Sequence, residues 1–258
     1  MAPDLGENEN EVEAVNKTIR ILELLREHDG VGVTELADRL GWPKSTVHNH
    51  LATLRRNEYI VQEDGEYKLG LRFLELGEFV KDRNEIYTLV EPKIQELAAD
   101  LGERVQFVVE EHGDGVYVRI ATGERAVSTG SRLGRRRSML HATAAGKSIL
   151  AFSPESEVHR VIERKGLPEL TANTITDEEE LFAALAEVRE RGYAFNYEEH
   201  IEGLRAVAAP VENESDEVVG AISVAGPAHR MRGDWFTEEL PDSILGIRNE
   251  LELDIAYK

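Results

Sequence analysis

The sequence predicts an α+β protein, with a helical module that contains one β-hairpin at the N-terminus and an antiparallel sheet domain at the C-terminus. Apolar residues recur at helical spacing through most of the first 101 residues, and the pattern changes to short β-prone runs after Gly102. Glycine-containing turns separate several of these runs, as is typical of hairpins. The predicted order is an acidic disordered tail over 1–12, a winged helix-turn-helix over 13–70, a helical linker over 71–101 and the sheet domain over 102–258.

Composition narrows the class of protein. The chain has 258 residues, enough for two domains, and no cysteine, which excludes a disulfide framework and a thiolate metal site. No apolar run is long enough to span a bilayer, and the first residues are acidic and lack a hydrophobic signal core. We therefore expect a cytoplasmic protein with no membrane partner.

Residues 13–70 contain the elements of a winged helix-turn-helix. Apolar residues from Val15 to Leu25 predict a first helix, and the segment 33–40 predicts a short amphipathic second helix. Gly41 permits a turn, and Pro43 opens a third helix. Two β-prone runs then follow, joined at Asp64-Gly65, which is a strong hairpin signal. This order is typical of modules that place the second helix of the pair in the major groove of DNA.

The helix that follows Pro43 has two distinct faces. Val47, Leu51 and Leu54 share one stripe at about 100° per residue and are predicted to be buried. On the opposite face, Asn49 and Ser45 can exchange hydrogen bonds with base edges, while basic side chains suit phosphates. The predicted DNA-binding residues are Lys44, Ser45, Thr46, His48, Asn49, Thr53, Arg55, Arg56 and, from the wing, Lys68.

The net charge at first argues against a nucleic-acid partner. The chain has 50 acidic and 30 basic residues, a formal net charge of −20, and phosphate repels carboxylate. However, no Asp or Glu lies between Pro43 and Asn57, which is the charge pattern of a DNA-binding face rather than of any solvated helix. An acidic, lysine-poor chain is typical of salt-accumulating cells, where salt screens surface repulsion over about 3 Å at 1 M. We therefore interpret the protein as halophilic.

The segment 71–101 predicts amphipathic helices, interrupted by Gly77, the polar residues 81–85 and Pro92. A helical linker with this much apolar surface is expected to pack against another protein surface. We expect a homodimer interface here. Packing on the chain's own C-terminal domain is the alternative, and both can hold.

Residues 102–258 alternate between strand and helix patterns. The first two strands are joined at Gly113-Asp114-Gly115, and Thr176 with Glu179 forms a capping box that opens a long helix. Antiparallel strands with helices outside are therefore expected. The predicted strands are 104–111, 116–123, 125–131, 193–197, 204–211 and 217–226, and the predicted helices are 139–152, 153–166, 176–192 and 240–253.

Several motifs resemble a known family. The segments LHATAAGKSILA, RGYAFNYEEHIEGLRAVAAPV and VGAISVAGP, together with the winged module, resemble the IclR family of transcription regulators from about Val15 to Leu253. The block EEHIEGLRAVAAPV is the more specific part, because many winged-helix families look alike. The resemblance implies a GAF-like C-terminal domain that binds a small organic acid, a sugar-derived metabolite or an aromatic acid. It also implies a dimer, often paired into a tetramer, on double-stranded operator DNA.

The predicted effector site begins at a helix N-terminus. Ala144, Ala145 and Gly146 are small, so backbone N–H groups at the positive end of the helix dipole are accessible to an anion. In similar proteins this segment holds the effector's carboxylate. The further pocket positions implied by the resemblance are Val127, Gly130, Ser138, Asn196, Leu204, Ala206, Ser223 and Ala225.

This chain departs from the common family pattern at three of those positions. Asn196 stands where Asp is frequent, Ala206 where Cys is frequent and Ala225 where Ser is frequent. Each change removes a charge or a polar group. The effector could therefore differ from a small keto acid.

Other chemical interpretations are weaker. Gly146-Lys147-Ser148 is similar to the end of a P-loop, but His141 stands where that motif requires glycine. A metal site that uses Glu199 and His200 is a minor alternative, and no metal is expected. Glu198 and Glu199 could form a carboxylate pair for acid–base chemistry, but a surface loop is the favoured interpretation.

A basic run stands out in this acidic chain. Arg132, Arg135, Arg136 and Arg137 could meet DNA phosphate, an acidic neighbouring subunit or an anionic effector, or they could form a solvated loop. A solvated loop is the favoured interpretation.

The leading hypothesis is a DNA-binding transcription regulator controlled by a small molecule, with no enzymatic activity and no cofactor. The alternative is an enzyme or a small-molecule-binding protein whose winged module mediates protein contacts.

Overall fold

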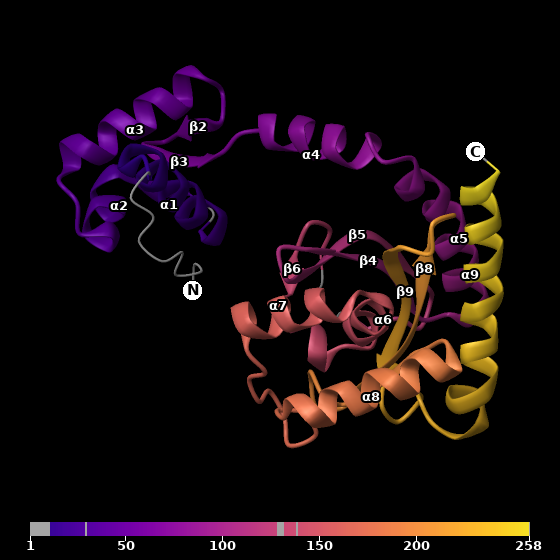
Figure 1. The fold of residues 1–258 in the computed structure, drawn as a ribbon. Helices are drawn as coiled ribbons and strands as arrows, with labels where there is room; N and C mark the ends of the chain where they lie inside the picture. The colour runs from indigo at the N-terminus through magenta and orange to yellow at the C-terminus, as the bar shows by residue number, and fades with distance from the viewer. Residues whose placement is uncertain (1–10, 29, 128–131, 138, 258) are drawn as a thin grey trace. The chain divides into compact units, whose positions relative to one another are not determined.

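The structure is a computed structural model that describes residues 11–28, 30–127, 132–137 and 139–257. The chain forms two compact units, Met1–Arg83 and Asn84–Lys258, which are described separately (Figure 1). Helices and antiparallel sheets occur in both units, so the predicted α+β class is confirmed. Most of the predicted acidic tail over 1–12 lies outside the described residues.

The first unit contains the predicted winged helix-turn-helix. Its helices pack around a small core that includes the fully buried Ile21, Leu36, Val47, Leu51 and Ile60. A two-residue strand that was not predicted, β1, pairs with β3, and the three-stranded sheet has the order β1-β3-β2. The elements are α1 (Glu13–Glu27), β1 (Val31–Gly32), α2 (Val33–Leu40), α3 (Lys44–Arg56), β2 (Ile60–Glu63) and β3 (Glu66–Leu69).

The turns of this unit follow from the residues in them. Gly41 ends α2 in the left-handed region, with φ at 67°, and Pro43 precedes the first residue of α3. Asp64 and Gly65 also have positive φ, at 50° and 87°, as a two-residue hairpin of the mirror-image type requires. The predicted wing hairpin is therefore confirmed.

Of the three predicted interruptions of the linker, only the one at the polar residues 81–85 is a break between helices. Helix α4 (Arg72–Asp82) continues through Gly77, and α5 (Glu85–Leu101) continues through Pro92. The predicted interruptions at these two residues are wrong. A single glycine costs a helix only about 1 kcal/mol relative to alanine, and the packing of α5 on the sheet outweighs the local effect of Pro92. The break lies between the helices, where Asn84 Oδ1 accepts a hydrogen bond from the Ile86 N–H at 3.1 Å and caps α5.

The two linker helices differ in burial. Helix α5 buries Val90, Ile94, Leu97 and Ala98 against the sheet of the second unit, as the alternative interpretation of the linker predicted. Helix α4 belongs to the first unit and buries none of its residues. Its exposed apolar side chains include Leu74, Phe79 and Val80.

The second unit is built on a six-stranded antiparallel sheet with the order β6-β5-β4-β9-β8-β7. Helices α5 and α9 pack on one face and α6 packs on the other, with α7 and α8 outside it (Figure 1). The remaining elements are β4 (Arg104–Glu111), β5 (Asp114–Thr122), β6 (Arg136–Arg137), η1 (Leu140–Ala142), α6 (Ala144–Phe152), α7 (Glu155–Lys165), α8 (Glu178–Arg191), β7 (Ala194–Tyr197), β8 (Leu204–Glu212), β9 (Val218–Pro227), the π-type turn η2 (Trp235–Glu239) and α9 (Leu240–Ala256).

The two faces of the sheet have different side chains. Large residues such as Phe107 and Ile222 fill the face under α5 and α9. On the other face, the small residues Ala208 and Ala221 meet Ala144 and Ala145 of α6. Small side chains on both surfaces allow α6 to lie close to the sheet, which positions the start of this helix over the strands.

Three local predictions in the second unit are wrong by small shifts. The first hairpin turns at His112-Gly113, both with positive φ, so Asp114 and Gly115 already belong to β5. The cap of α8 is Asp177, whose Oδ1 accepts from the Glu180 N–H at 2.9 Å, rather than Thr176. The described part of 125–131 contains no strand, and β6 follows it at Arg136–Arg137.

Candidate DNA-binding surface and effector cavity

Helix α3 presents the predicted polar face to solvent. Val47, Leu51 and Leu54 are buried, whereas Ser45 and Asn49 are exposed. The other exposed side chains of the predicted set are Lys44, His48, Thr53, Arg55 and Arg56, and Thr46 is half-buried. The described surface of this helix therefore carries several donors and cations and no carboxylate.

Some of these side chains have protein partners. Arg55 Nη1 donates to Gln62 Oε1 at 2.5 Å and thereby ties the end of α3 to the wing. Lys68 is half-buried, and its Nζ lies 3.3 Å from Glu63 Oε2. Thr53 Oγ1 donates to the Asn49 carbonyl at 2.9 Å, as helical threonines often do. The wing cation is therefore partly neutralised within its own hairpin.

A cavity lies between the N-terminal end of α6, the sheet and the β7–β8 loop. Its volume is about 50 Å³, and it is lined mainly by apolar side chains with a few polar groups. A cavity of this size holds a small number of water molecules, so a larger organic acid would displace part of its wall. The predicted effector residues that line the cavity are Ala144, Ala145, Asn196, Leu204, Ala206, Ser223 and Ala225.

The start of α6 has the features of an anion site. Thr143 caps the helix by accepting the Gly146 N–H at 3.0 Å through Oγ1, and its carbonyl accepts the Lys147 N–H at 2.9 Å. The N–H groups of Ala144 and Ala145 precede these bonds, in the first turn, where helical donors have no intrahelical acceptor. Both residues line the cavity.

Other predicted effector residues have different surroundings. Gly146 packs against η1 instead of lining the cavity. A Cβ there would lie 2.1 Å from the Leu140 carbonyl oxygen, so close packing requires glycine at this position. Val127 is half-buried and does not line the cavity. Gly130 and Ser138 lie outside the described residues.

Asn196 lines the cavity but uses its amide on the backbone. Its Nδ2 donates to the Ala142 carbonyl at 2.5 Å, and its Oδ1 accepts the Glu199 N–H at 3.3 Å. These bonds join η1, β7 and the following loop.

Several lining residues were not predicted, among them Gln106, Tyr117, Thr143, His200, Ile201 and Arg205. Strand pairing could have indicated one of them, because Gln106 is the cross-strand partner of Ser223 and shares its face. Thr143 could also have been predicted as a helix cap, because threonine is a common N-cap residue and this one directly precedes the small residues that open the helix. The lining residues of the β7–β8 loop could not have been predicted in this way, because they follow no periodic pattern in the sequence.

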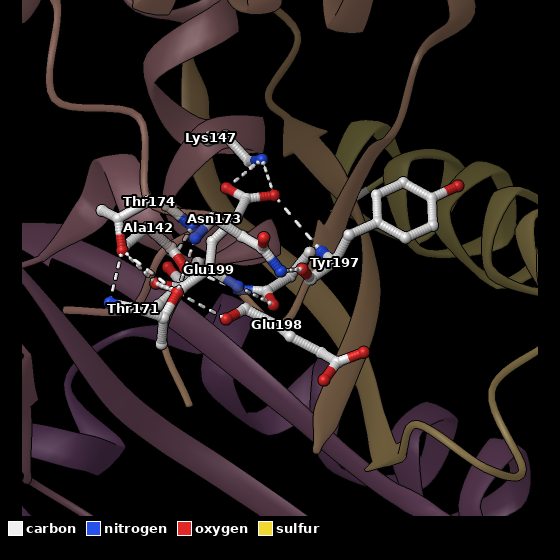
Figure 2. A network of polar contacts seen from close by, with 11 residues as sticks. Ala142, Lys147, Thr171, Asn173, Thr174, Tyr197, Glu198 and Glu199 are labelled. Atoms are coloured by element: carbon white, nitrogen blue, oxygen red, sulfur yellow. Dashed lines mark hydrogen bonds and ion pairs between the residues drawn. The ribbon is translucent and has the colours of Figure 1, made fainter. Parts of the chain in front are cut away.

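The β7–β8 loop contains a buried ion pair that sequence reasoning missed. Glu199 was expected in a surface loop, but its side chain is only 8% exposed, and that of Lys147 on α6 is 7% exposed. The Lys147 Nζ lies 2.6 Å from Glu199 Oε1 and 2.5 Å from Oε2 (Figure 2). The expectation of a surface position for Glu199 is therefore wrong, because the loop folds inward over α6.

Burial shapes the electrostatics around this pair. Desolvation lowers the pKa of the Lys147 ammonium, and the Glu199 carboxylate opposes this shift. Burial also lowers the pKa of His141, although its ring contacts the Pro168 carbonyl at 3.2 Å. Glu198, the other residue of the predicted carboxylate pair, instead faces Arg205, with 3.0 Å between Oε1 and Nη2. The two carboxylates therefore have separate cationic partners.

Other charged groups are also paired. Arg136 of the basic run forms ion pairs with Glu111 and, at 3.7 Å, with Asp114. Among the described residues, no three His, Asp or Glu side chains cluster closely enough to hold a metal ion. Within the same part of the chain, no helix is long and apolar enough to cross a membrane.

Comparisons with known proteins agree with this architecture. The model described as "Bacterial transcriptional regulator IclR C-terminal" matches residues 79–246, and "IclR helix-turn-helix domain" matches 14–64. The chain is 32% identical to the "Probable HTH-type transcriptional regulator ArcR" of the halophilic archaeon Halobacterium salinarum, with 98% of each chain covered. It is 33% identical to the transcriptional repressor IclR of Escherichia coli, with 99% of this chain and 92% of the relative covered.

A solved structure shares the fold. The IclR protein of Thermotoga maritima superimposes with a TM-score of 0.81 at 28% identity, covering 96% of this chain and 100% of the other. The matches span both units, and the related proteins are transcription regulators rather than enzymes. The chain therefore belongs to the IclR family of DNA-binding transcription regulators.

Proposed function

We propose that this regulator binds its operator through the exposed face of α3 and that a small carboxylate in the α6 cavity controls the binding. The observation that carries the proposal is the charge of α3. In a chain with a net charge of −20, this helix has no carboxylate and exposes Lys44, Arg55 and Arg56. Such a surface favours a polyanion.

Within that surface, Ser45 and Asn49 would recognise the bases, because both are exposed opposite the buried stripe. An asparagine amide can form two hydrogen bonds with adenine in the major groove. Arg56 and Lys44 would contact phosphates. Arg55 would do so only after its hydrogen bond to Gln62 breaks.

The cavity favours an effector with a carboxylate and a largely apolar remainder. The carboxylate would accept the N–H groups of Ala144 and Ala145 at the positive end of α6. Ala206 and Ala225 add no polar group, and the Asn196 amide is already bonded to the backbone. Ser223 and Gln106 would then orient a single hydroxyl or carbonyl group of the ligand.

The exposed apolar surface of the first unit supports a homodimer. Helix α4 exposes Leu74, Phe79 and Val80, and α1 exposes Val15 and Ile19. Apolar stripes of this kind on helices are usually covered by a partner. A two-fold dimer would place two α3 helices on half-sites one helical turn apart or a multiple of it.

The acidic composition and the Halobacterium relative support a protein that works in the salt-rich cytoplasm of a halophile. Unfolding measured against KCl concentration tests this part. Stability that is equal in dilute buffer and in concentrated KCl would contradict it.

The experiment for the whole proposal is a gel shift in KCl on the DNA upstream of this gene and its neighbours, with acetate, pyruvate and 4-hydroxybenzoate as ligands. The matched amides serve as controls for the carboxylate. Ala145→Trp should fill the cavity and abolish the ligand response while DNA binding stays intact. If this variant loses both properties together, the effector site is misplaced.

A further inference from the structure

The buried Lys147–Glu199 pair joins two walls of the cavity. Lys147 lies on α6, one turn after Ala144 and Ala145, which line the cavity. Glu199 lies in the β7–β8 loop, and its neighbours His200 and Ile201 line the cavity from the other side. The bidentate contact between the ammonium and the carboxylate is therefore a direct link between the anion-binding wall and the loop.

The main chain of the loop depends on the placement of Glu199. The Glu199 carbonyl accepts the Thr174 hydroxyl at 2.6 Å, and its Oε1 also accepts the Tyr197 N–H at 3.3 Å (Figure 2). Thr171 Oγ1 donates to the Glu198 carbonyl at 2.8 Å. Glu198 has φ at +68°, a conformation that a non-glycine residue keeps only when its surroundings hold it.

A larger effector would have to move a wall as it enters, because the cavity is small, at about 50 Å³. The α6 wall is fixed, because Gly146 lies directly against Leu140 and the first eight residues of the helix are buried. The loop is the wall with exposed residues, including Ile201, and it is bounded by Gly203 with φ at +75°.

The two charges of the pair act on an incoming anion in opposite directions. The Lys147 ammonium lies in the first turns of α6 and adds to the positive potential of the helix N-terminus. The Glu199 carboxylate cancels that charge while the cavity is empty. A ligand carboxylate on the N–H groups of Ala144 and Ala145 would lie about one helical turn away, repel Glu199 and attract Lys147.

We propose that Lys147 and Glu199 are the positioning pair of the cavity: they hold loop 198–203 closed on α6, and a bound carboxylate weakens the hold of Glu199 so that the loop moves. This inference rests on the proposed carboxylate effector. It identifies the loop as the first element that responds to the ligand. Neither residue needs to touch the ligand.

The first test needs no ligand and measures backbone hydrogen exchange in the full chain. Lys147→Met/Glu199→Met removes both charges, a change that buried pairs often tolerate. We expect loop 198–203 to exchange roughly tenfold faster while β4 and α9 are unchanged. Glu199→Asp keeps the charge and shortens the reach, and it should accelerate the same segment. Lys165→Met breaks a comparable pair with Asp114 (2.6 Å) and is the control that should leave the loop unchanged.

The second test measures affinity for the tightest carboxylate of the panel and for its amide. Glu199→Gln should raise the carboxylate affinity and Lys147→Met should lower it, each by roughly tenfold, as expected for one close charge interaction. Neither variant should change the affinity for the amide by that factor. A role confined to stability would make both substitutions weaken binding in the same direction.

Different outcomes test the positioning role of the pair and the proposed effector chemistry separately. Unchanged loop exchange in both Glu199→Asp and the double variant, or uniformly faster exchange throughout the unit, overturns the positioning role. Equal signs for Glu199→Gln and Lys147→Met overturn the charge coupling. If no carboxylate binds the wild-type chain, the proposed effector chemistry fails, while the exchange experiment still decides whether the pair positions the loop.

Discussion

Helices α3 and α6 carry the two proposed binding sites, one in each unit, and the two sites use different surfaces of a helix. Helix α3 buries one aliphatic stripe and exposes polar and basic side chains. Helix α6 buries every residue from Ala144 to Ala151 and offers backbone N–H groups at its N-terminus. A long rigid polyanion is recognised by side chains on an exposed face, whereas a small anion is recognised by backbone groups inside a cavity. Substitutions should therefore have different consequences in the two helices.

The largest effect is expected for Gly146→Ala. The added Cβ would lie 2.1 Å from the Leu140 carbonyl oxygen, so backbone must shift and the second unit should lose about 3 kcal/mol of stability. Thermal unfolding in KCl measures this change. Gly246→Ala on α9 is the matched control, because nothing lies within 4 Å of its Cβ, and it should stabilise by about 0.5–1 kcal/mol. Equal behaviour of the two variants would contradict the close packing of α6.

The next effect concerns the specificity of DNA binding. Asn49→Ala should remove base contacts and relax preference at one position of the site, at a cost of roughly 1–3 kcal/mol. Stability should stay unchanged, because the side chain is exposed. Competition binding with single-base variants of the operator provides the measurement. A loss that is equal on every sequence would remove Asn49 from the base-recognition role.

A smaller, uniform effect is expected for Arg56→Ala. Loss of one phosphate contact should weaken binding to all sequences alike and lower the salt slope by about 1. Lys68→Ala is the comparison, since Lys68 already faces Glu63 at 3.3 Å and should contribute less. Titrations across KCl concentrations measure both slopes. A steeper loss for Lys68→Ala would mean that the wing, rather than the end of α3, carries the phosphate contact.

The sequence was most informative where side chains carry the function. The stripe of Val47, Leu51 and Leu54 and the acid-free face opposite it could be located from spacing and composition, and the structure exposes Ser45 and Asn49 as expected. The small residues at the start of α6 could also be found. Their location at a cavity depends on strands β8 and β9, which are far away in the sequence.

Local patterns gave wrong predictions where tertiary packing outweighs them. Pro92 was predicted to interrupt a helix but lies inside α5, which packs on the sheet, and Glu199 was predicted at the surface but is buried against Lys147. These two charged residues are 52 positions apart, and no periodicity connects them. Their pairing arises because the β7–β8 loop folds over α6.

The sequence by itself determined the class of fold and the polar, acid-free face of α3, because these depend on local periodicity, turn chemistry and charge, and its motifs carried the resemblance to the family. Only the tertiary structure decided which residues enclose the cavity and how Lys147 meets Glu199. Enclosure requires segments from distant parts of the chain to approach each other, and that approach is set by how the sheet and its helices pack together.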